Sequence, residues 1–303
     1  MQIRIGTRNS PLAMWQAKEV EQKLQNLGYE TTLVPVLSSG DKNLNQPLYS
    51  LGITGVFTKD LDIALLNNEI DIAVHSLKDV PTLLPQNIEI SAVLERDFPQ
   101  DVLVRKSSSK NKDLAELKIA TSSLRRRAFW LEQFPNTEFS DIRGNVQTRL
   151  KKLEEGDFDA TLFSLAGIKR MEMELDFEYL DFMISAPSQG VVAIASRIDD
   201  VETKEILQKI NHEETQICVE IERNFLRTLE GGCTAPIGAI AKFNEGKIKF
   251  EGKLNALDGS KTIHLAEEFD YNNSENFGEK FAKIILEKGG KEMMEEIKKN
   301  LKT

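Results

Sequence analysis

Three consecutive arginines, Arg125, Arg126 and Arg127, lie in the segment TSSLRRRAFW at residues 121–130. The chain carries a formal net charge of −9, so it gains no solubility from a local basic cluster. Successive residues of a helix point about 100° apart, and three neighbours therefore cannot share one solvated face. Arginine binds carboxylates and phosphates with a bidentate fork that lysine lacks. An anion-binding site is favoured over the alternative, a solvated helix face.

Other arginines repeat this arrangement. Of the thirteen arginines, six lie between residues 121 and 170. In DIRGNVQTR, Arg143 stands between a predicted strand and a predicted helix, and Arg149 lies inside that helix. Ligands of open α/β sheets bind at the carboxyl edge of the strands, where free helix N–H groups attract anions. Arg8 and Ser10 also stand between a predicted strand and a predicted helix, near the N-terminus. Because several arginines can each bind one carboxylate, we expect a ligand with several carboxylates.

Lys78 and Asp79 end a predicted strand in AVHSLKDVP. A carboxylate does not help an anion to bind, but it stabilises positive charge that develops on a substrate. The alternative is that Asp79 is only a turn residue. His75 alternates with apolar residues and is interpreted as a packed core histidine.

The two cysteines differ in their surroundings. Cys218 is in phase with Ile221 and Phe225 on a predicted helix, which indicates a buried apolar position. Cys233 follows two glycines in LEGGCTAP, and is either an incidental loop thiol or a nucleophile or attachment point. Because no His or Cys stands near it at metal-ligand spacing, we expect no metal site.

The composition limits the class of protein. The chain has 303 residues, 40% hydrophobic and 29% charged, as in ordinary globular proteins. Its acidic balance argues against a nucleic-acid binder. Without an apolar run of 18 residues or an N-terminal signal peptide, we expect no membrane association and a cytoplasmic location.

The predicted elements form an α/β protein with three domains. Strands and helices alternate over residues 1–95, with an irregular segment at 38–55 that we interpret as a lid. A second alternation occupies 96–189, where ATLFSLAG at 160–167 is one of the predicted strands. A strand at 191–198 is expected to return to the first domain. Two α/β domains with a cleft between them are therefore expected, one formed by 1–95 with about 190–211 and the other by 96–189.

Residues 212–303 form the third predicted domain, which is small and of the α+β class. A long helix precedes a ladder of hairpin strands whose turns are NEG at 244–246 and DGS at 258–260. A single amphipathic helix is expected from about 275 to 302.

Several motifs, taken together and in order, resemble the porphobilinogen deaminase family, also called hydroxymethylbilane synthases. They cover nearly the whole chain: GTRNSPLA, GVFTKDLDIALL, DIAVHSLKDVP, TSSLRR, RGNVQTRL, LAGIKRM, PSQGVVAI and LEGGCTAPIGA. The resemblance implies two α/β domains like those of periplasmic binding proteins, and a third domain that carries a dipyrromethane cofactor. It also implies a monomeric transferase that condenses four porphobilinogen molecules with release of ammonia and frees hydroxymethylbilane with water.

The resemblance also implies roles for individual residues. The cofactor is joined by a thioether to Cys233, and Asp79 is the catalytic aspartate that stabilises cationic intermediates. Lys59 belongs to the lid. The remaining cofactor ligands are Ser76, Lys78, Asp79, Ser123, Arg125, Arg126 and Arg143, and the substrate ligands are Arg8, Ser10, Phe57, Arg149, Arg170 and Gln189.

The chain departs from the family at a few positions. Thr54 replaces a lysine that many members have in the lid, and Asp60 stands where glutamate is common. Arg127 falls where the family varies and is expected to be peripheral. A two-domain protein that binds carboxylates without turnover is the alternative function.

Overall fold

The computed structural model describes residues 2–37, 58–229, 235–273 and 276–301. The chain divides into two compact units. Unit 1 contains the described residues up to 97 together with 190–217, and unit 2 contains 98–189 and the described residues from 218 onward.

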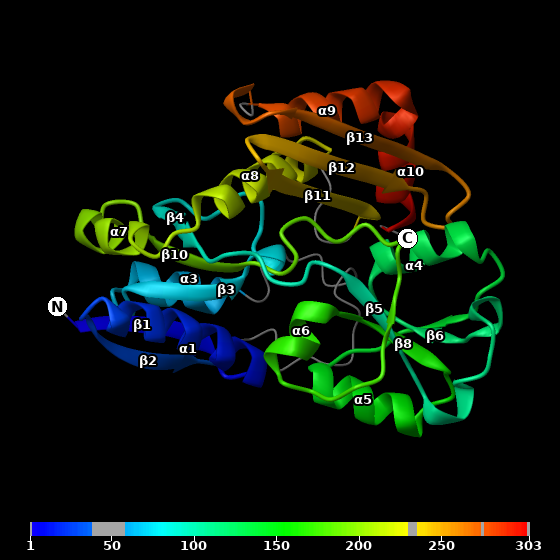
Figure 1. Ribbon diagram of the computed structural model, residues 1–303, viewed down its shortest axis with the longest axis horizontal. Helices are drawn as coiled ribbons and strands as arrows, with labels where there is room; N and C mark the ends of the chain where they lie inside the picture. The colour runs from blue at the N-terminus through cyan, green and yellow to red at the C-terminus, as the bar shows by residue number, and fades with distance from the viewer. Residues whose placement is uncertain (1, 38–57, 230–234, 274–275, 302–303) are drawn as a thin grey trace. The chain divides into compact units, whose positions relative to one another are not determined.

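A five-stranded sheet forms the centre of unit 1 (Figure 1). The strands in spatial order are β2 (Glu30–Val36), β1 (Gln2–Arg8), β3 (Ile72–Ser76), β10 (Val192–Arg197) and β4 (Ile88–Val93). β1 is parallel to β2 and β3, whereas β10 is antiparallel to β3 and β4. The returning strand predicted at 191–198 is thus β10, which pairs between β3 and β4.

Helices cover both faces of this sheet. α1 (Pro11–Asn26) and α7 (Val201–Gln208) share one core with β1 and β3. α3 (Lys59–Leu66) packs on the opposite face, with Leu61 and Leu65 against Ala73. α1 begins where the sequence predicts, because the Ser10 hydroxyl accepts a hydrogen bond from the Ala13 N–H at 3.3 Å and Pro11 opens the first turn.

Unit 2 contains a second five-stranded sheet with the same pattern of strand directions. The spatial order is β7 (Phe139–Ser140), β6 (Ile119–Ala120), β8 (Ala160–Ser164), β5 (Asp101–Arg105) and β9 (Glu178–Tyr179). β6 is parallel to β7 and β8, and β5 is antiparallel to β8 and β9.

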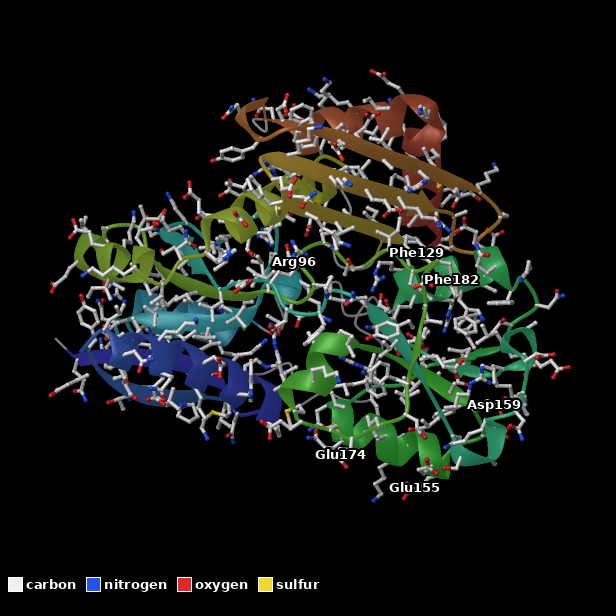
Figure 2. The ribbon with its side chains drawn as sticks, viewed as in Figure 1. Arg96, Phe129, Glu155, Asp159, Glu174 and Phe182 are labelled. Atoms are coloured by element: carbon white, nitrogen blue, oxygen red, sulfur yellow. The ribbon has the colours of Figure 1, made fainter. Side chains whose placement is uncertain are left out.

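Three helices flank the second sheet. α4 (Leu124–Gln133) supplies Phe129 and Trp130 to one core, against which Phe182 packs (Figure 2). α5 (Val146–Glu155) and α6 (Leu165–Arg170) share another core, to which Leu153 and Ile168 belong.

A separate antiparallel sheet follows, in the order β11 (Ile237–Asn244), β12 (Lys247–Asn255) and β13 (Thr262–Asp270). The rings of Phe225 in α8 (Glu213–Thr228) and Phe250 in β12 lie 5.2 Å apart. α9 (Phe277–Ile285) stacks Phe281 on Phe250 at 4.8 Å. Two α/β sheets and a small α+β part therefore confirm the predicted fold class.

Two predicted elements are wrong in detail. The segment ATLFSLAG (160–167) is a strand only to Ser164, and Leu165 already begins α6. The C-terminal helix is interrupted at Leu286–Gly290, because Gly289 has a left-handed φ of +101°, and α10 (Lys291–Asn300) follows. The predicted lid at 38–55 lies outside the described residues. The three domain boundaries and the expected cleft stay predictions.

The helices in the described ranges include none that is long and apolar enough to cross a membrane.

Candidate functional site

The arginine cluster of unit 2 begins where β6 leads into α4. Ser123 caps α4 by accepting a hydrogen bond from the Arg126 N–H at 3.4 Å. This cap starts the helix immediately before Arg125 and Arg126. Both arginines are buried, with 6% and 7% of their surface exposed. The basic segment is therefore not a solvated helix face.

Arg126 is held by a buried carboxylate that the sequence analysis missed. Its Nε and Nη2 donate to Asp101 Oδ1 at 3.0 and 2.7 Å, and its Nη1 donates to the Leu162 carbonyl at 2.8 Å. The side chain of Asp101 has no exposed surface. Arg126 is thus fixed by three contacts in the interior of unit 2.

Arg125 shares the same carboxylate through Nη1. That nitrogen lies 2.7 Å from Asp101 Oδ2 and donates to the Ile184 carbonyl at 2.6 Å. Burial lowers the pKa of Arg125, the carboxylate of Asp101 opposes this shift, and the positive charge of Arg126 adds to it. Asp101 therefore offsets part of the repulsion between two neighbouring buried cations.

Gln189 joins this cluster from the segment that precedes β10. Its Nε2 donates to Asp101 Oδ1 at 3.1 Å and to the Pro99 carbonyl at 2.7 Å. The preceding Ser188 adopts a left-handed φ of +66°, and its N–H donates to Glu222 Oε2 at 2.6 Å. Glu222 thus supports the backbone conformation that directs Gln189 toward Asp101.

Arg149 adds a third positive charge. Asn145 caps α5 by accepting from the Thr148 N–H at 2.8 Å, which places Arg149 in the second turn of the helix. The guanidinium carbon lies 4.1 Å from the centre of the Phe163 ring. Its Nε is buried and has no hydrogen-bond partner within the described part of the chain. Burial, with a smaller contribution from Arg126, lowers the pKa of Arg149 to about 9, so it is protonated at neutral pH.

The other three arginines between residues 121 and 170 occupy different positions. Arg170 is buried in α6, and Arg143 is half-buried before Gly144, whose φ is +119°. The side chain of Arg127 is 28% exposed and lies 3.4 Å from Asp141 Oδ1. Among the ion pairs of the described residues, Arg127 contacts Asp141 and not Asp101, and its peripheral role stays a prediction.

The predicted site residues of unit 1 gather at the carboxyl ends of β1 and β3. Arg8 is the last residue of β1, and Ser76, the last residue of β3, accepts from Gln16 Nε2 at 2.8 Å. Lys78 and Asp79 follow in a single helical turn, Leu77–Asp79, and both are half-buried. The Leu77 N–H donates to the Val191 carbonyl at 3.0 Å and fixes the start of this turn.

His75 is buried beneath this edge, which confirms its interpretation as a core residue. Burial lowers its pKa to about 4, and the positive charge of Arg8 contributes to the shift. His75 is therefore neutral near pH 7.

Other predicted positions are only partly described. Lys59 is exposed at the first position of α3, and Asp60 follows it. Phe57, Thr54 and Cys233 lie outside the described residues. Cys218 is 3% exposed on α8, which confirms its interpretation as a buried apolar residue.

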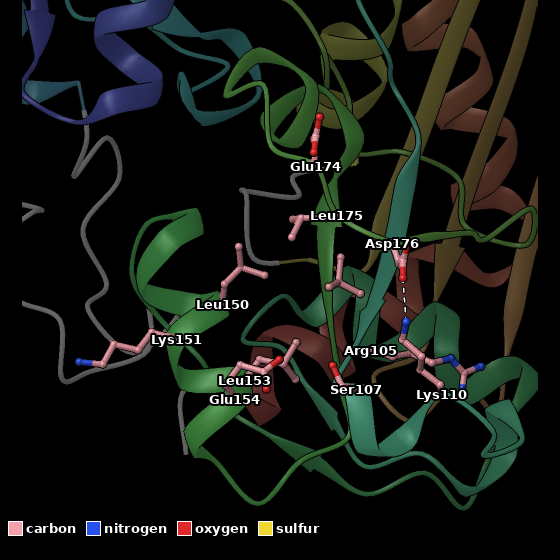
Figure 3. A pocket seen from close by; sticks show the side chains of 11 residues that line it. Arg105, Ser107, Lys110, Leu150, Lys151, Leu153, Glu154, Glu174, Leu175 and Asp176 are labelled. Atoms are coloured by element: carbon pink, nitrogen blue, oxygen red, sulfur yellow. Dashed lines mark hydrogen bonds and ion pairs between the residues drawn. The ribbon is translucent and has the colours of Figure 1, made fainter.

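A pocket of about 460 Å³ lies at the other end of β5 from Asp101 (Figure 3). Val104, Arg105 and residues of α5 line it, and Lys110 on its wall pairs with Asp176 at 2.8 Å. Its lining mixes both signs of charge and includes no predicted site residue. It is not a candidate for the anion site.

Within the described ranges, no group of three or more His, Cys, Asp and Glu residues is placed to hold a metal ion.

Two family models match the chain. Residues 3–205 match "Porphobilinogen deaminase, dipyromethane cofactor binding domain", and residues 216–287 match "Porphobilinogen deaminase, C-terminal domain". A "Probable porphobilinogen deaminase" of Methanocaldococcus jannaschii is 50% identical over 247 residues, 80% of this chain and 84% of that protein. A "Porphobilinogen deaminase" of Chlorobium luteolum is 40% identical over 311 residues, 99% of each chain.

Solved structures show a weaker likeness. A putative methionine-binding lipoprotein of Bacillus subtilis is 15% identical, with a TM-score of 0.41, over 70% of this chain and 90% of that chain. The L-cystine solute receptor of Neisseria gonorrhoeae is also 15% identical, with a TM-score of 0.38, over 75% of this chain and 86% of that chain.

Proposed function

We propose a function for this chain from its family, since it belongs to the porphobilinogen deaminases. It is the transferase that joins four porphobilinogen molecules head to tail with loss of ammonia and releases hydroxymethylbilane. The reaction belongs to tetrapyrrole biosynthesis. A covalently bound dipyrromethane supplies the primer on which the chain of pyrroles is built. We place the enzyme in the cytoplasm and expect a monomer.

The observation that carries this proposal is the excess of buried positive charge in unit 2. Arg126 lies close enough to lower the pKa of both Arg125 and Arg149, and Asp101 neutralises only one of the three charges. Burying cations without anions is costly, so the cluster is suited to a bound anion. The buried Nε of Arg149 is a donor still available to such a ligand.

These residues fit dipyrromethane, since each of its pyrroles carries an acetate and a propionate group. A guanidinium binds a carboxylate with two parallel hydrogen bonds, and several arginines at one sheet edge can bind several carboxylates. We assign the cofactor to Ser76, Lys78, Asp79, Ser123, Arg125, Arg126 and Arg143, and the substrate to Arg8, Ser10, Phe57, Arg149, Arg170 and Gln189. Lys59 is assigned to the lid.

Cys233 is the proposed attachment point. The other cysteine, Cys218, is buried among the apolar residues of α8 and is inaccessible to a ligand of this size. A thioether must form at an accessible thiolate, and the two glycines before Cys233 in the sequence predict an irregular segment that would suit that requirement.

Asp79 is the proposed catalytic residue. It lies in the turn after β3, which the Leu77–Val191 hydrogen bond fixes, so its carboxylate is held at the carboxyl edge of the parallel strands. Loss of ammonia from porphobilinogen leaves positive charge on the substrate. A fixed carboxylate stabilises that charge, while the arginines hold the substrate carboxylates in place.

Two measurements on the purified protein test the proposal. Intact mass spectrometry should find a covalent dipyrromethane, and added porphobilinogen should be consumed with release of ammonia. Cys233→Ser should remove the added mass and most activity, whereas Cys218→Ala should keep both. A protein that binds porphobilinogen but has no added mass and releases no ammonia would instead be the non-catalytic carboxylate binder.

A further inference from the structure

Asp101 is a carboxylate at the centre of a site that is otherwise basic. It contacts Arg125, Arg126 and Gln189, and its side chain is fully buried. We infer that Asp101 is a positioning residue: it fixes Arg126 as an internal anchor and orients Arg125 so that its free edge receives a carboxylate of the ligand. This inference rests on the proposed function for the identity of the ligand.

The place of Asp101 follows from the direction of its strand. β5 runs antiparallel to β8, and Asp101, its first residue, pairs with Ser164, the last residue of β8. The start of β5 therefore lies at the same sheet edge as the ends of the parallel strands β6 and β8. That edge is where α4 begins and where Arg125 and Arg126 stand.

The two arginines are engaged to different extents. All three nitrogens of Arg126 already donate, to Asp101 and to the Leu162 carbonyl, which leaves one N–H on each Nη for the assigned contact with the cofactor. In the contacts among described residues, Arg125 uses only Nη1. The Nε and Nη2 of Arg125 form the guanidinium edge that binds a carboxylate with two parallel hydrogen bonds.

The carboxylate of Asp101 does not prevent the basic site from binding an anion. Three clustered cations repel one another, and without a counter-charge their side chains would move apart. Asp101 neutralises one charge and leaves two for the ligand. Its contact with Gln189 also links the arginine pair to the segment before β10. The shape of the basic site is then set before the ligand arrives, which reduces the cost of ordering side chains on binding.

Asp159 provides a matched control. It is also a buried carboxylate of the same sheet, just before β8, and therefore lies at the opposite end of that strand. It accepts hydrogen bonds from Lys112 Nζ and the Lys118 N–H at 2.8 and 2.9 Å. Asp159→Asn removes a buried charge from unit 2 without touching the arginine cluster.

The experiment compares wild type, Asp101→Asn and Asp159→Asn. We expect Asp101→Asn to incorporate dipyrromethane about tenfold more slowly, measured by intact mass after porphobilinogen is added to cofactor-free protein, since it loses its ion pairs with Arg125 and Arg126. Asp159→Asn should incorporate dipyrromethane at the wild-type rate, even if its unfolding midpoint falls by as much as that of Asp101→Asn or by more. The inference would be overturned if Asp101→Asn incorporates dipyrromethane as fast as wild type. It would also be overturned if the rate of incorporation falls in both variants in proportion to their loss of stability.

A second readout does not depend on the ligand. In wild type the Arg126 Nε–H, bonded to buried Asp101, should exchange slowly with solvent in nitrogen-15 NMR spectra, and Asp101→Asn should accelerate this exchange. Rapid exchange in wild type would contradict the anchor role even if the enzyme is active. Slow exchange in a wild-type protein that never gains dipyrromethane would uphold the anchor and reject the proposed function.

Discussion

Glu132 in the last turn of α4 forms an ion pair with Lys253 of β12, at 2.5 Å between Oε2 and Nζ. The same oxygen accepts a hydrogen bond from Asn255 at 2.8 Å, and Lys253 also lies 4.9 Å from the centre of the Phe129 ring. The helix that begins with the buried arginines is therefore braced at its other end by the three-stranded sheet. α4 and the three-stranded sheet both belong to unit 2. The sheet therefore stabilises the C-terminal end of the helix whose N-terminal end carries Arg125 and Arg126.

The first prediction tests this bracing at Gly259, in the turn after β12. A Cβ there would lie 2.5 Å from the Glu132 backbone nitrogen, and φ is +72°. Gly259→Ala should lower the free energy of unfolding by more than about 2 kcal/mol, because strain and a backbone clash add. Gly246→Ala is the control, with φ of +81° but no atom within 4 Å. Similar losses in both variants, measured by denaturant unfolding, would show that the contact with α4 contributes nothing.

The second prediction separates the three neighbouring arginines. Arg125→Ala and Arg126→Ala each remove one buried partner of Asp101 while the other arginine still compensates its charge, so each should cost about 1–3 kcal/mol of unfolding free energy. Both variants should also be isolated largely without dipyrromethane. Arg127→Ala removes a partly exposed contact and should cost less than about 1 kcal/mol with normal cofactor content. Equal effects at all three positions, by unfolding and intact mass, would contradict this separation.

The third prediction concerns Asp79. Asp79→Asn keeps the size and polarity of the side chain but removes its charge. The arginines should still bind the carboxylates of porphobilinogen, whereas ammonia release should fall by about two to three orders of magnitude, since one placed electrostatic contact contributes roughly 3–4 kcal/mol to a transition state. Single-turnover measurements with porphobilinogen check both parts. Ammonia release near the wild-type rate would reduce Asp79 to a turn residue.

The fourth prediction is a pH dependence at Asp62 in α3. Burial raises its pKa to about 6, against a smaller opposing effect of its hydrogen bond with Thr58. An acid with a raised folded-state pKa destabilises the fold when ionised, so the cost is absent below about pH 3.8 and complete above pH 6. Asp62→Asn should therefore stabilise the protein by about 1–3 kcal/mol at pH 7.5, and this gain should shrink toward pH 4.

Denaturant unfolding of both proteins across this range measures the difference. A variant that is less stable than wild type by the same amount at every pH would mean that the hydrogen bond with Thr58 outweighs the burial of charge.

The local elements could be predicted from the sequence because their signals are local. Ser10 and Pro11 start α1, Ser123 caps α4, and Asn244, Glu245 and Gly246 form a tight turn whose last two residues have positive φ. The arginine-rich strand-to-helix junctions also indicated an anion site, since the carboxyl edge of a parallel sheet follows from chain direction alone.

The tertiary structure decided the partners of those arginines. Asp101 opens a strand, and a strand's start belongs at the amino edge of a parallel sheet; only the antiparallel placement of β5 brings it to Arg125 and Arg126. Leu165 begins a helix although its apolar neighbours also suit a strand, because periodicity cannot separate the two over so short a run. Sequence patterns report what each segment can form, whereas burial and charge pairing depend on which segments meet.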